Sequence, residues 1–223
     1  MSPEPTTRER LILAAERLFA EYGIDAVSLR QVNAAAGQRN ASASHYHFGS
    51  KEALIEAILE HRMPAINQRR LELLEELEAT DRAAEPRALV EAIVRPLAEH
   101  LDDGAGHYVR FLAAVTGHHN SRVSAVVAGR HGAGVLGAAA RLRAVLVDLP
   151  APVFAQRFQL AVAQTIYALA DRERLAHAAS NTVPRVSQPF FVQNLVDAVT
   201  GALCAPLSPA AARELEGHGS PPA

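Results

Sequence analysis

Glycines 23, 37 and 49 divide the first 60 residues into short segments, and each segment has the pattern of a helix. In residues 7–22 the apolar side chains recur at intervals of one, three and four positions, which places them on one stripe of an α-helix. Serine or threonine stands where the helices need a cap, and a glycine can close a helix by adopting a left-handed conformation. The pattern therefore predicts three short helices that pack together, followed by the start of a long fourth helix.

The rest of the chain continues the helical pattern, because alanine and leucine dominate it and β-branched residues seldom alternate with polar ones. The predicted fold is all-α. Residues 1–50 are expected to form one domain and residues 51–204 a larger helical one, while the Pro-, Gly- and Ala-rich residues 205–223 are expected to be a disordered tail. Long amphipathic helices are expected at about 51–79, 86–101, 106–119, 135–147, 152–177 and 188–204.

Composition excludes several classes of function. The single cysteine, Cys204, rules out a disulfide framework and a multi-cysteine metal site. The ten histidines show no spacing that completes a metal site with a carboxylate, and no nucleophile motif is present, so no metal, cofactor or catalytic activity is expected. No apolar segment has the length of a membrane span. We expect a cytoplasmic protein with no membrane partner.

Positive charge is concentrated just before the long fourth helix. Between residues 28 and 51 the charged residues are Arg30, Arg39 and Lys51, which give +3, and no Asp or Glu occurs. Residues 52–80 carry seven acids against three arginines, a balance of −4. Lys51 is the only lysine in the chain. This concentration of positive charge at residues 28–51 predicts local contact with an anion, although chance variation along a solvated surface remains an alternative.

Two short helices joined by a glycine-containing turn suit a helix-turn-helix motif, whose second helix enters a DNA major groove; a plain helical hairpin is the alternative. The segment between Arg39 and His47 offers polar groups for DNA, while Ala41, Ala43, Tyr46 and Phe48 are expected to pack inward. Lys51 would lie beside a backbone phosphate at the start of the next helix.

The stretches "RERLILAAERLFAEYGIDAVSLRQV" and "AAGQRNASASHYHFGSKEALIEAIL" together resemble the DNA-binding domain of the TetR family of transcriptional regulators. The family signature is a glycine turn, a short recognition helix that ends in an aromatic-His-Phe triplet, then a small residue, Ser or Asn, and Lys. The resemblance implies a repressor that binds double-stranded DNA at a pseudo-palindromic operator as a homodimer. It also implies that a ligand in a second, helical domain releases the DNA.

Position by position, the resemblance assigns DNA contacts to His47 and Lys51 and places His45 where the family commonly has a phosphate-binding tyrosine. The chain departs from the family in having one extra residue between Gly37 and the "YHF" triplet, so base contacts in residues 39–43 are uncertain by one position. The candidate DNA-binding residues are Ser28, Arg30, Arg39, Asn40, Ser42, Ser44, His45, His47 and Lys51.

The second domain is expected to bind a small effector and to form the dimer. Apolar walls with scattered polar groups would suit an amphipathic or anionic lipophile, such as an acyl thioester or a small aromatic acid. Residues 152–177 and 188–204 are predicted to form the dimer face, or alternatively to complete a monomer core. The candidate effector residues are Arg110, His118, His119, Arg141, Arg157 and Tyr167, unless they serve only surface solvation and hydrogen bonds between helices.

Two other functions remain open. "GAGVLG" at residues 132–137 satisfies the GxGxxG pattern of a dinucleotide-binding oxidoreductase, which would need flanking strands and an acid such as Asp148. Arg130 and His131 interrupt the approach to the first glycine, and no further strands follow, so the pattern favours a helix instead. The other alternative is a helix-turn-helix protein that has no small-molecule effector.

Overall fold

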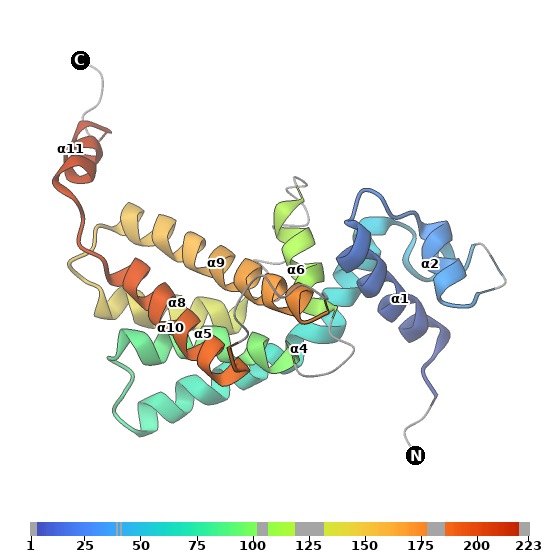
Figure 1. The fold of residues 1–223 in the computed structure, drawn as a ribbon, viewed down its shortest axis with the longest axis horizontal. Coiled ribbons are helices and arrows are strands. Elements are labelled where there is room, and N and C mark those ends of the chain that lie inside the picture. Colours follow the sequence, from blue (N-terminus) through green and yellow to red (C-terminus); the bar gives the residue numbers. More distant parts are fainter. Residues whose placement is uncertain are drawn as a thin grey trace.

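A computed structural model describes residues 4–38, 40, 42–101, 107–118, 132–177 and 186–218, and every regular element in these ranges is helical (Figure 1). The predicted all-α fold is confirmed. The elements are α1 (Thr7–Tyr22), α2 (Leu29–Ala35), α3 (Ala43–Phe48), α4 (Lys51–Ala79), α5 (Pro86–Ala98), the 3-10 turn η1 (Glu99–Leu101), α6 (Tyr108–Gly117), α8 (Ala133–Val145), α9 (Ala151–His177), α10 (Gln188–Cys204) and α11 (Pro209–His218).

The predicted helix boundaries in the first 60 residues are confirmed by their caps. The Thr6 side chain accepts the backbone N–H of Glu9, and the Glu9 carboxylate accepts the N–H of Thr6, so α1 begins in a capping box. Ser28 and Gln31 make the same exchange at the start of α2. Gly23 ends α1 with φ 81°, in the region that disfavours any residue with a Cβ.

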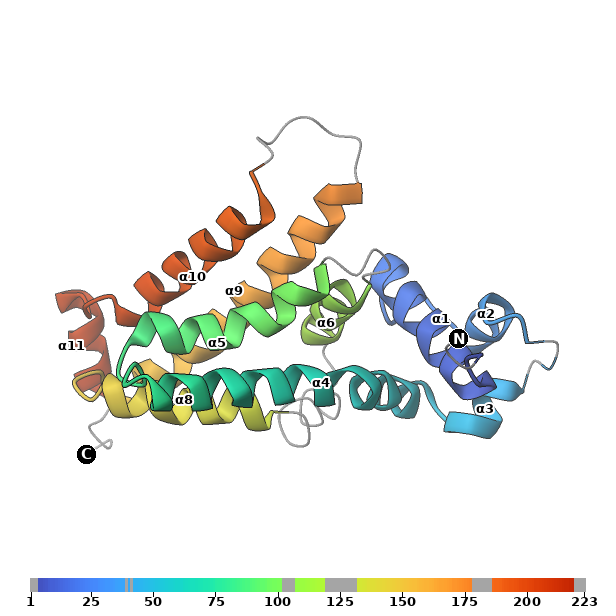
Figure 2. The same cartoon turned by 90° about the horizontal axis from the view of Figure 1, so that it is seen from below.

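Helix α5 occupies the centre of the larger helical body, where nine of its thirteen residues are buried. Helices α4, α8, α9 and α10 all contact it, and Figure 2 shows α4 running along this body from the end that carries α1, α2 and α3. Helix α4 is therefore shared. Its first turns contact α1 and α3 of the N-terminal domain, and its later turns belong to the core of the second domain.

Helix α6 joins the two parts of the molecule, because it contacts α1 on one side and α9 on the other. The rings of Phe19 on α1 and Phe111 on α6 stack with their centroids 6.3 Å apart, and both side chains are fully buried. Next to this contact, the Arg62 guanidinium on α4 donates to both carboxylate oxygens of Glu16 on α1, at 2.8 and 3.0 Å. The N-terminal helices are thus fixed to the second domain by an aromatic stack and a forked ion pair.

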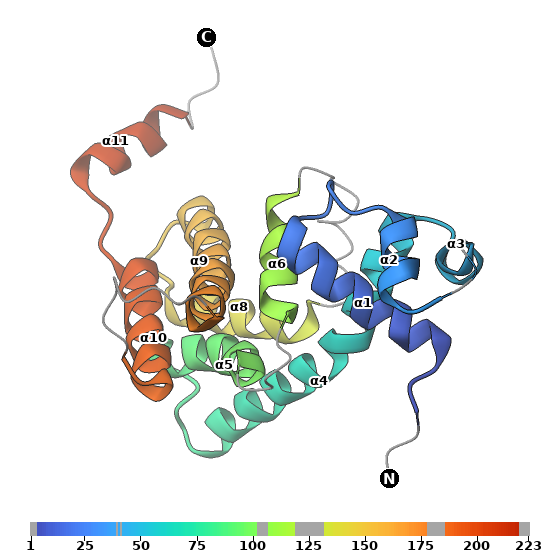
Figure 3. The same ribbon diagram turned by 45° about the vertical axis from the view of Figure 1, so that its right-hand side comes forward.

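One prediction is corrected by the fold, and the fold decides against one alternative. The tail expected to be disordered contains α11, because Ser208 caps the backbone N–H of Ala211, Pro209 opens the first turn, and "AAARELE" is rich in helix-forming residues. Figure 3 shows α11 projecting away from the rest of the molecule. "GAGVLG" starts helix α8 rather than a dinucleotide-binding turn, and no strand occurs in the part of the chain that the structure describes.

Gly134 of "GAGVLG" has a packing role. A Cβ added to Gly134 would lie 2.9 Å from the Cβ of Arg70 and 3.2 Å from Oδ1 of Asn67, so the glycine lets α8 lie directly against α4.

In the described ranges no single helix is long and apolar enough to cross a bilayer, and only α10 and α11 taken together pass that test, with a bend of 53° between them.

Candidate DNA-binding surface and regulatory core

Helix α3 is held in place by a polar contact in the interior of the N-terminal domain. The backbone N–H of Ser44 donates to Oδ1 of Asn33 on α2 at 2.9 Å, and the Ser44 hydroxyl donates to the carbonyl of Leu29 at 3.4 Å. A buried N–H that lost its acceptor would keep its full desolvation cost, so this contact fixes the distance and rotation of α3 relative to α2.

The same contact corrects the assignment of Ser44. We predicted that Ser44 would face DNA, but its exposed fraction is 0% and its hydroxyl and backbone N–H both bond inward. The alternation of alanine and serine across residues 41–44 gives no sign of which side is buried. Ser44 therefore helps to position α3 and does not belong to its outer surface.

The outer surface of α3 consists of three consecutive ring side chains. His45, Tyr46 and His47 are all exposed, and Tyr46 is the most open of them at 86%. Tyr46 was predicted to pack inward, so this expectation was wrong: Ala43 and Ser44 supply the buried side instead. The rings of Tyr46 and His47 meet edge to face at 5.2 Å, and the His45 Nδ1 lies 3.0 Å from the carbonyl of Gly49.

The turn before α3 is organised by Asn40. Its Oδ1 accepts the backbone N–H of Ser42 at 2.9 Å, and its carbonyl accepts the N–H of Ala43. Asn40 and Ser42 are both exposed at the entrance to the helix. Arg39 lies outside the described residues. Which of the residues in this turn reads a base remains a prediction.

Lys51 has a partner within the protein. Its Nζ donates to the carbonyl of Ile24, in the loop between α1 and α2, at 2.9 Å. This bond ties the first residue of α4 to the opposite side of the N-terminal domain, and an ammonium group has two further N–H donors for a phosphate. Ser28 and Arg30, at the start of α2, are exposed as predicted positions for DNA contact require.

Arg8 is a cation that the sequence analysis did not single out. Its guanidinium lies over the ring of Phe48, 5.4 Å from the centroid, so the start of α1 and the end of α3 meet. Arg8 is exposed and adds a positive charge beside the α3 surface. Only a contact between residues 40 positions apart brings it there, and no local pattern reveals such a contact.

Of the six predicted effector residues, the five that the structure describes make separate contacts. His119 lies outside the described residues, and Tyr167 is 46% exposed on α9. The others make separate contacts: Arg110 Nε lies 3.4 Å from Glu173 Oε1, His118 Nδ1 lies 3.4 Å from Asp25 Oδ2, Arg141 Nε donates to Glu78 at 3.0 Å, and Arg157 donates to the carbonyl of Leu203 at 3.1 Å. These hydrogen bonds and ion pairs between elements match the alternative reading stated for them.

The pair of Arg110 and Glu173 lies between α6 and α9. Burial raises the pKa of the Glu173 carboxyl to about 7, although the Arg110 guanidinium acts in the opposite direction. Burial and the same guanidinium lower the pKa of His107. The α6–α9 contact therefore contains a carboxyl group that changes its charge near neutral pH.

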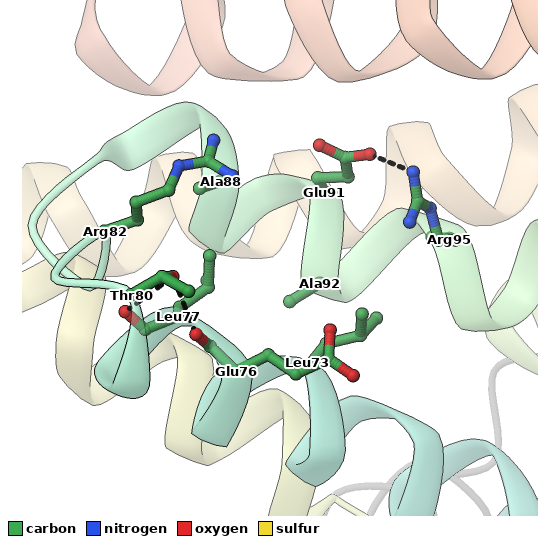
Figure 4. A pocket seen from close by; sticks show the side chains of 9 residues that line it. All are labelled: Leu73, Glu76, Leu77, Thr80, Arg82, Ala88, Glu91, Ala92 and Arg95. Carbon is green, nitrogen blue, oxygen red and sulfur yellow. Dashed lines mark hydrogen bonds and ion pairs between the residues drawn. The ribbon is translucent and has the colours of Figure 1, made fainter.

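A cavity of about 250 Å³ opens between the end of α4 and the start of α5 (Figure 4). Leu73, Leu77, Ala88 and Ala92 form its apolar part. Charged side chains surround it, and Arg95 is paired with Glu91. None of the five predicted effector residues that the structure describes lines it. The described residues that line it are Leu73, Glu76, Leu77, Thr80, Arg82, Ala88, Glu91, Ala92 and Arg95.

Comparison with protein-family models gives two matches that divide the chain in the same order as the fold. The model described as bacterial regulatory proteins, tetR family, matches residues 11–58, and the model described as tetracyclin repressor-like, C-terminal domain, matches residues 91–202. No curated protein matches the chain.

Solved structures share the fold along most of the chain. A transcriptional regulator from Rhodococcus sp. Rha1 is 21% identical with a TM-score of 0.53, covering 89% of this chain and 96% of its own. NalD from Pseudomonas aeruginosa, the secondary repressor of the MexAB-OprM multidrug efflux pump, is 20% identical with a TM-score of 0.57, covering 90% of this chain and 98% of its own. At these identities the likeness shows the fold alone.

Proposed function

This chain belongs to the TetR family of DNA-binding transcriptional regulators, and on that basis we propose that it is a ligand-released repressor that binds a pseudo-palindromic operator as a homodimer. The family match supports DNA binding and non-enzymatic action. Repression, ligand release and the dimer are our proposal, as is a cytoplasmic location. NalD is a repressor by its description, which supports the same role here.

The observation that carries the proposal is the open ring surface of α3. Tyr46 and His47 project from a helix whose other side is anchored by the buried bond between Asn33 and Ser44. Exposed rings with polar tips can donate to phosphates and contact base edges, while the anchored side keeps the helix from rotating away from the groove. Arg30, Lys51 and Arg8 supply positive charge around this surface.

Helix α4 provides the connection between DNA and effector. It begins with Lys51 beside α3 and continues into the core of the second domain, and the pair of Arg62 with Glu16 transmits any shift of α4 to α1. Helix α6 forms a second connection through Phe111 and Phe19. We propose that the effector binds the second domain in a state that moves these contacts. The effector must bind this released state more tightly than the DNA-bound one.

Helices α9 and α10 support the proposed homodimer. They pack against each other, and large apolar side chains remain exposed on them, among them Leu160 and Tyr167 at positions seven apart on α9 and Phe190 on α10. Positions seven apart lie on one face of a helix. A two-fold dimer could cover this face with its own copy, which would set the two α3 helices in successive major grooves.

The test is fluorescence anisotropy with labelled duplexes from the intergenic DNA on either side of the gene, over a series of salt concentrations. Wild-type protein should bind one duplex more tightly than a scrambled duplex of equal composition. Tyr46→Ala should weaken that binding by roughly 10-fold, as expected for loss of one specific contact. Arg30→Ala should lower the affinity for both duplexes and reduce the salt slope by about 1.

Arg174→Ala is the matched control, because it removes one exposed arginine from α9, away from the α3 surface. Its affinity and salt slope should equal those of the wild type. Lys51 is unsuitable as the only variant, since loss of its bond to Ile24 could unfold the N-terminal domain. Equal affinity of wild type, Tyr46→Ala and Arg30→Ala for the selected duplex would contradict the proposed DNA surface.

A further inference from the structure

A buried arginine lies in the middle of the second domain without a carboxylate partner. Arg70, on α4, has an exposed fraction of 2%. Within the described ranges no acid forms an ion pair with it, and its side chain makes one hydrogen bond, from Nη1 to Oδ1 of Asn67 at 3.3 Å. Its Nε is buried and has no partner. A guanidinium carries five N–H donors, so most of them are unused by the protein.

A second unpartnered donor lies close to this guanidinium. The Tyr108 hydroxyl, on α6, is buried and has no hydrogen-bond partner. The two groups interact electrostatically, because Tyr108 raises the pKa of Arg70 and Arg70 lowers that of Tyr108, in each case against the larger effect of burial. Burial raises the pKa of Tyr108, so the phenol keeps its proton and can donate it to an acceptor. Helix α8 covers the other side, where Gly134 lies against the Arg70 stem.

The charge on Arg70 persists in this environment. Burial lowers its pKa to about 10, which leaves the guanidinium protonated at neutral pH. A buried ion without a counter-ion destabilises a fold, because its lost hydration is not replaced. A methionine or leucine would fill the same space without that cost. The residue is therefore poorly explained by stability, and well explained by a role in binding an anion.

The surroundings are otherwise apolar. One turn further along each helix, on the same side as Arg70, Tyr108 and Gly134, lie Leu74, Leu112 and Ala138, and all three are buried. A ligand that reaches the two donors would meet hydrocarbon from three helices. A small inorganic anion would leave those apolar side chains without a contact, whereas an organic acid would contact both the two donors and the apolar side chains.

We infer that Arg70 and Tyr108 form the anchor for the effector, which is an organic acid with a carboxylate head and an apolar body held between α4, α6 and α8. This inference rests on the proposed function, since it names the class of ligand that releases DNA. A guanidinium donates two parallel N–H bonds to a carboxylate, and the phenol adds a third donor.

The position of this anchor explains how its occupation reaches DNA. The Tyr108 ring lies 6.0 Å from that of Phe111, and Phe111 stacks on Phe19 of α1. Arg70 lies on α4, two turns after Arg62, which holds Glu16 of α1. A carboxylate that draws Arg70 and Tyr108 together acts on both connections to the N-terminal domain at once.

The test uses the full chain and a series of sodium carboxylates from acetate to decanoate, each paired with the primary alcohol of equal length. Thermal unfolding reports binding, and anisotropy of the labelled operator reports release. A carboxylate of the series should raise the Tm of the wild type more than its alcohol does. Arg70→Met should weaken that carboxylate roughly 10- to 100-fold, the usual effect of losing hydrogen bonds to a charged group.

Two controls separate binding from folding. Without ligand, Arg70→Met should be at least as stable as the wild type, because it removes a buried charge, and Arg174→Met should respond to carboxylates as the wild type does. Tyr108→Phe removes only the hydroxyl, so it should keep its Tm and lose part of the carboxylate response. This second variant tests the anchor without removing the buried charge.

A Tm of Arg70→Met several degrees below the wild-type value would overturn the inference, because it would show a structural partner for the charge. So would a series in which carboxylates and alcohols act alike, or act equally on wild type and Tyr108→Phe. Operator binding without ligand keeps the two proposals apart. If carboxylates bind through Arg70 but the protein binds no DNA, the proposed repressor function is wrong and the carboxylate site stands. If the protein binds DNA but no carboxylate binding depends on Arg70, the carboxylate site is wrong.

Discussion

The forked ion pair between Glu16 on α1 and Arg62 on α4 offers a quantitative test of how the two parts of the molecule are joined. The Glu16 side chain is only 3% exposed, whereas the Arg62 side chain retains 27% of its exposure. The two partners should therefore differ in what they cost when left alone. Glu16→Met and Arg62→Met remove one charge each, and both replace a long side chain with another of similar length.

The burial of each partner sets the expected magnitudes. Arg62→Met leaves a carboxylate almost without water, so it should lower the free energy of unfolding by ~3–5 kcal/mol. Glu16→Met leaves a guanidinium that still reaches solvent, so the loss should be smaller, about 1–2 kcal/mol. The double variant should be more stable than Arg62→Met, because an apolar pair replaces the isolated carboxylate.

Urea unfolding of all four proteins at pH 7 measures these free energies and the coupling between the two positions. The coupling energy should be at least ~2 kcal/mol, well above the usual non-additivity of distant sites. Arg174→Met is a suitable control, since its ion pair with Asp171 is exposed and should change stability by less than ~1 kcal/mol. Additive losses, or a loss below ~1 kcal/mol for Arg62→Met, would refute the reasoning from burial.

Two further predictions concern the second domain. Gly134→Ala should lower the free energy of unfolding by ~1–3 kcal/mol, because the added Cβ would lie 2.9 Å from Arg70 Cβ. Gly137→Ala should be nearly neutral, because its Cβ would lie 3.4 Å from the nearest atom. Urea unfolding compares the two variants, and equal losses would argue against close packing of α8 on α4. Glu173 has a pKa raised from 4.5 to about 7, so between these pH values the folded state binds more protons than the unfolded state. The protonated carboxyl therefore contributes ~3 kcal/mol to the free energy of unfolding. This contribution is complete below pH 4.5 and is lost as the pH rises through 7. Glu173→Gln should remove that part of the pH dependence between pH 5 and 8, and an unchanged dependence would contradict the raised pKa.

Local patterns predicted the helices well, because caps and apolar periodicity act over a few residues. The helices at 7–22, 51–79 and 188–204 have the predicted bounds, and the glycine after α1 adopts the left-handed conformation that ends it. The prediction of a disordered tail was wrong for a local reason as well, since the prolines and glycines of residues 205–223 were given more weight than the capped, alanine-rich segment that forms α11.

The orientation of side chains depends on contacts that no local pattern contains. Ser44 turns inward because Asn33, eleven residues earlier, accepts its backbone N–H, and Tyr46 is then carried to the outside. Arg70 resembles any arginine on an amphipathic helix, and only the packing around α4, with α8 directly against it, reveals that it is buried without an acid. Helix positions were therefore predictable, while the outer surface of α3 and the anchor in the second domain were not.

Footprinting of the operator complex with hydroxyl radicals tests the central claim most directly. A homodimer that places α3 in successive major grooves should protect two equivalent segments whose centres lie one or more helical turns apart, about 10 base pairs each. Tyr46→Ala should reduce the protection of both DNA segments equally. A single asymmetric protected segment, or protection that survives Tyr46→Ala unchanged, would contradict recognition of DNA by paired α3 surfaces.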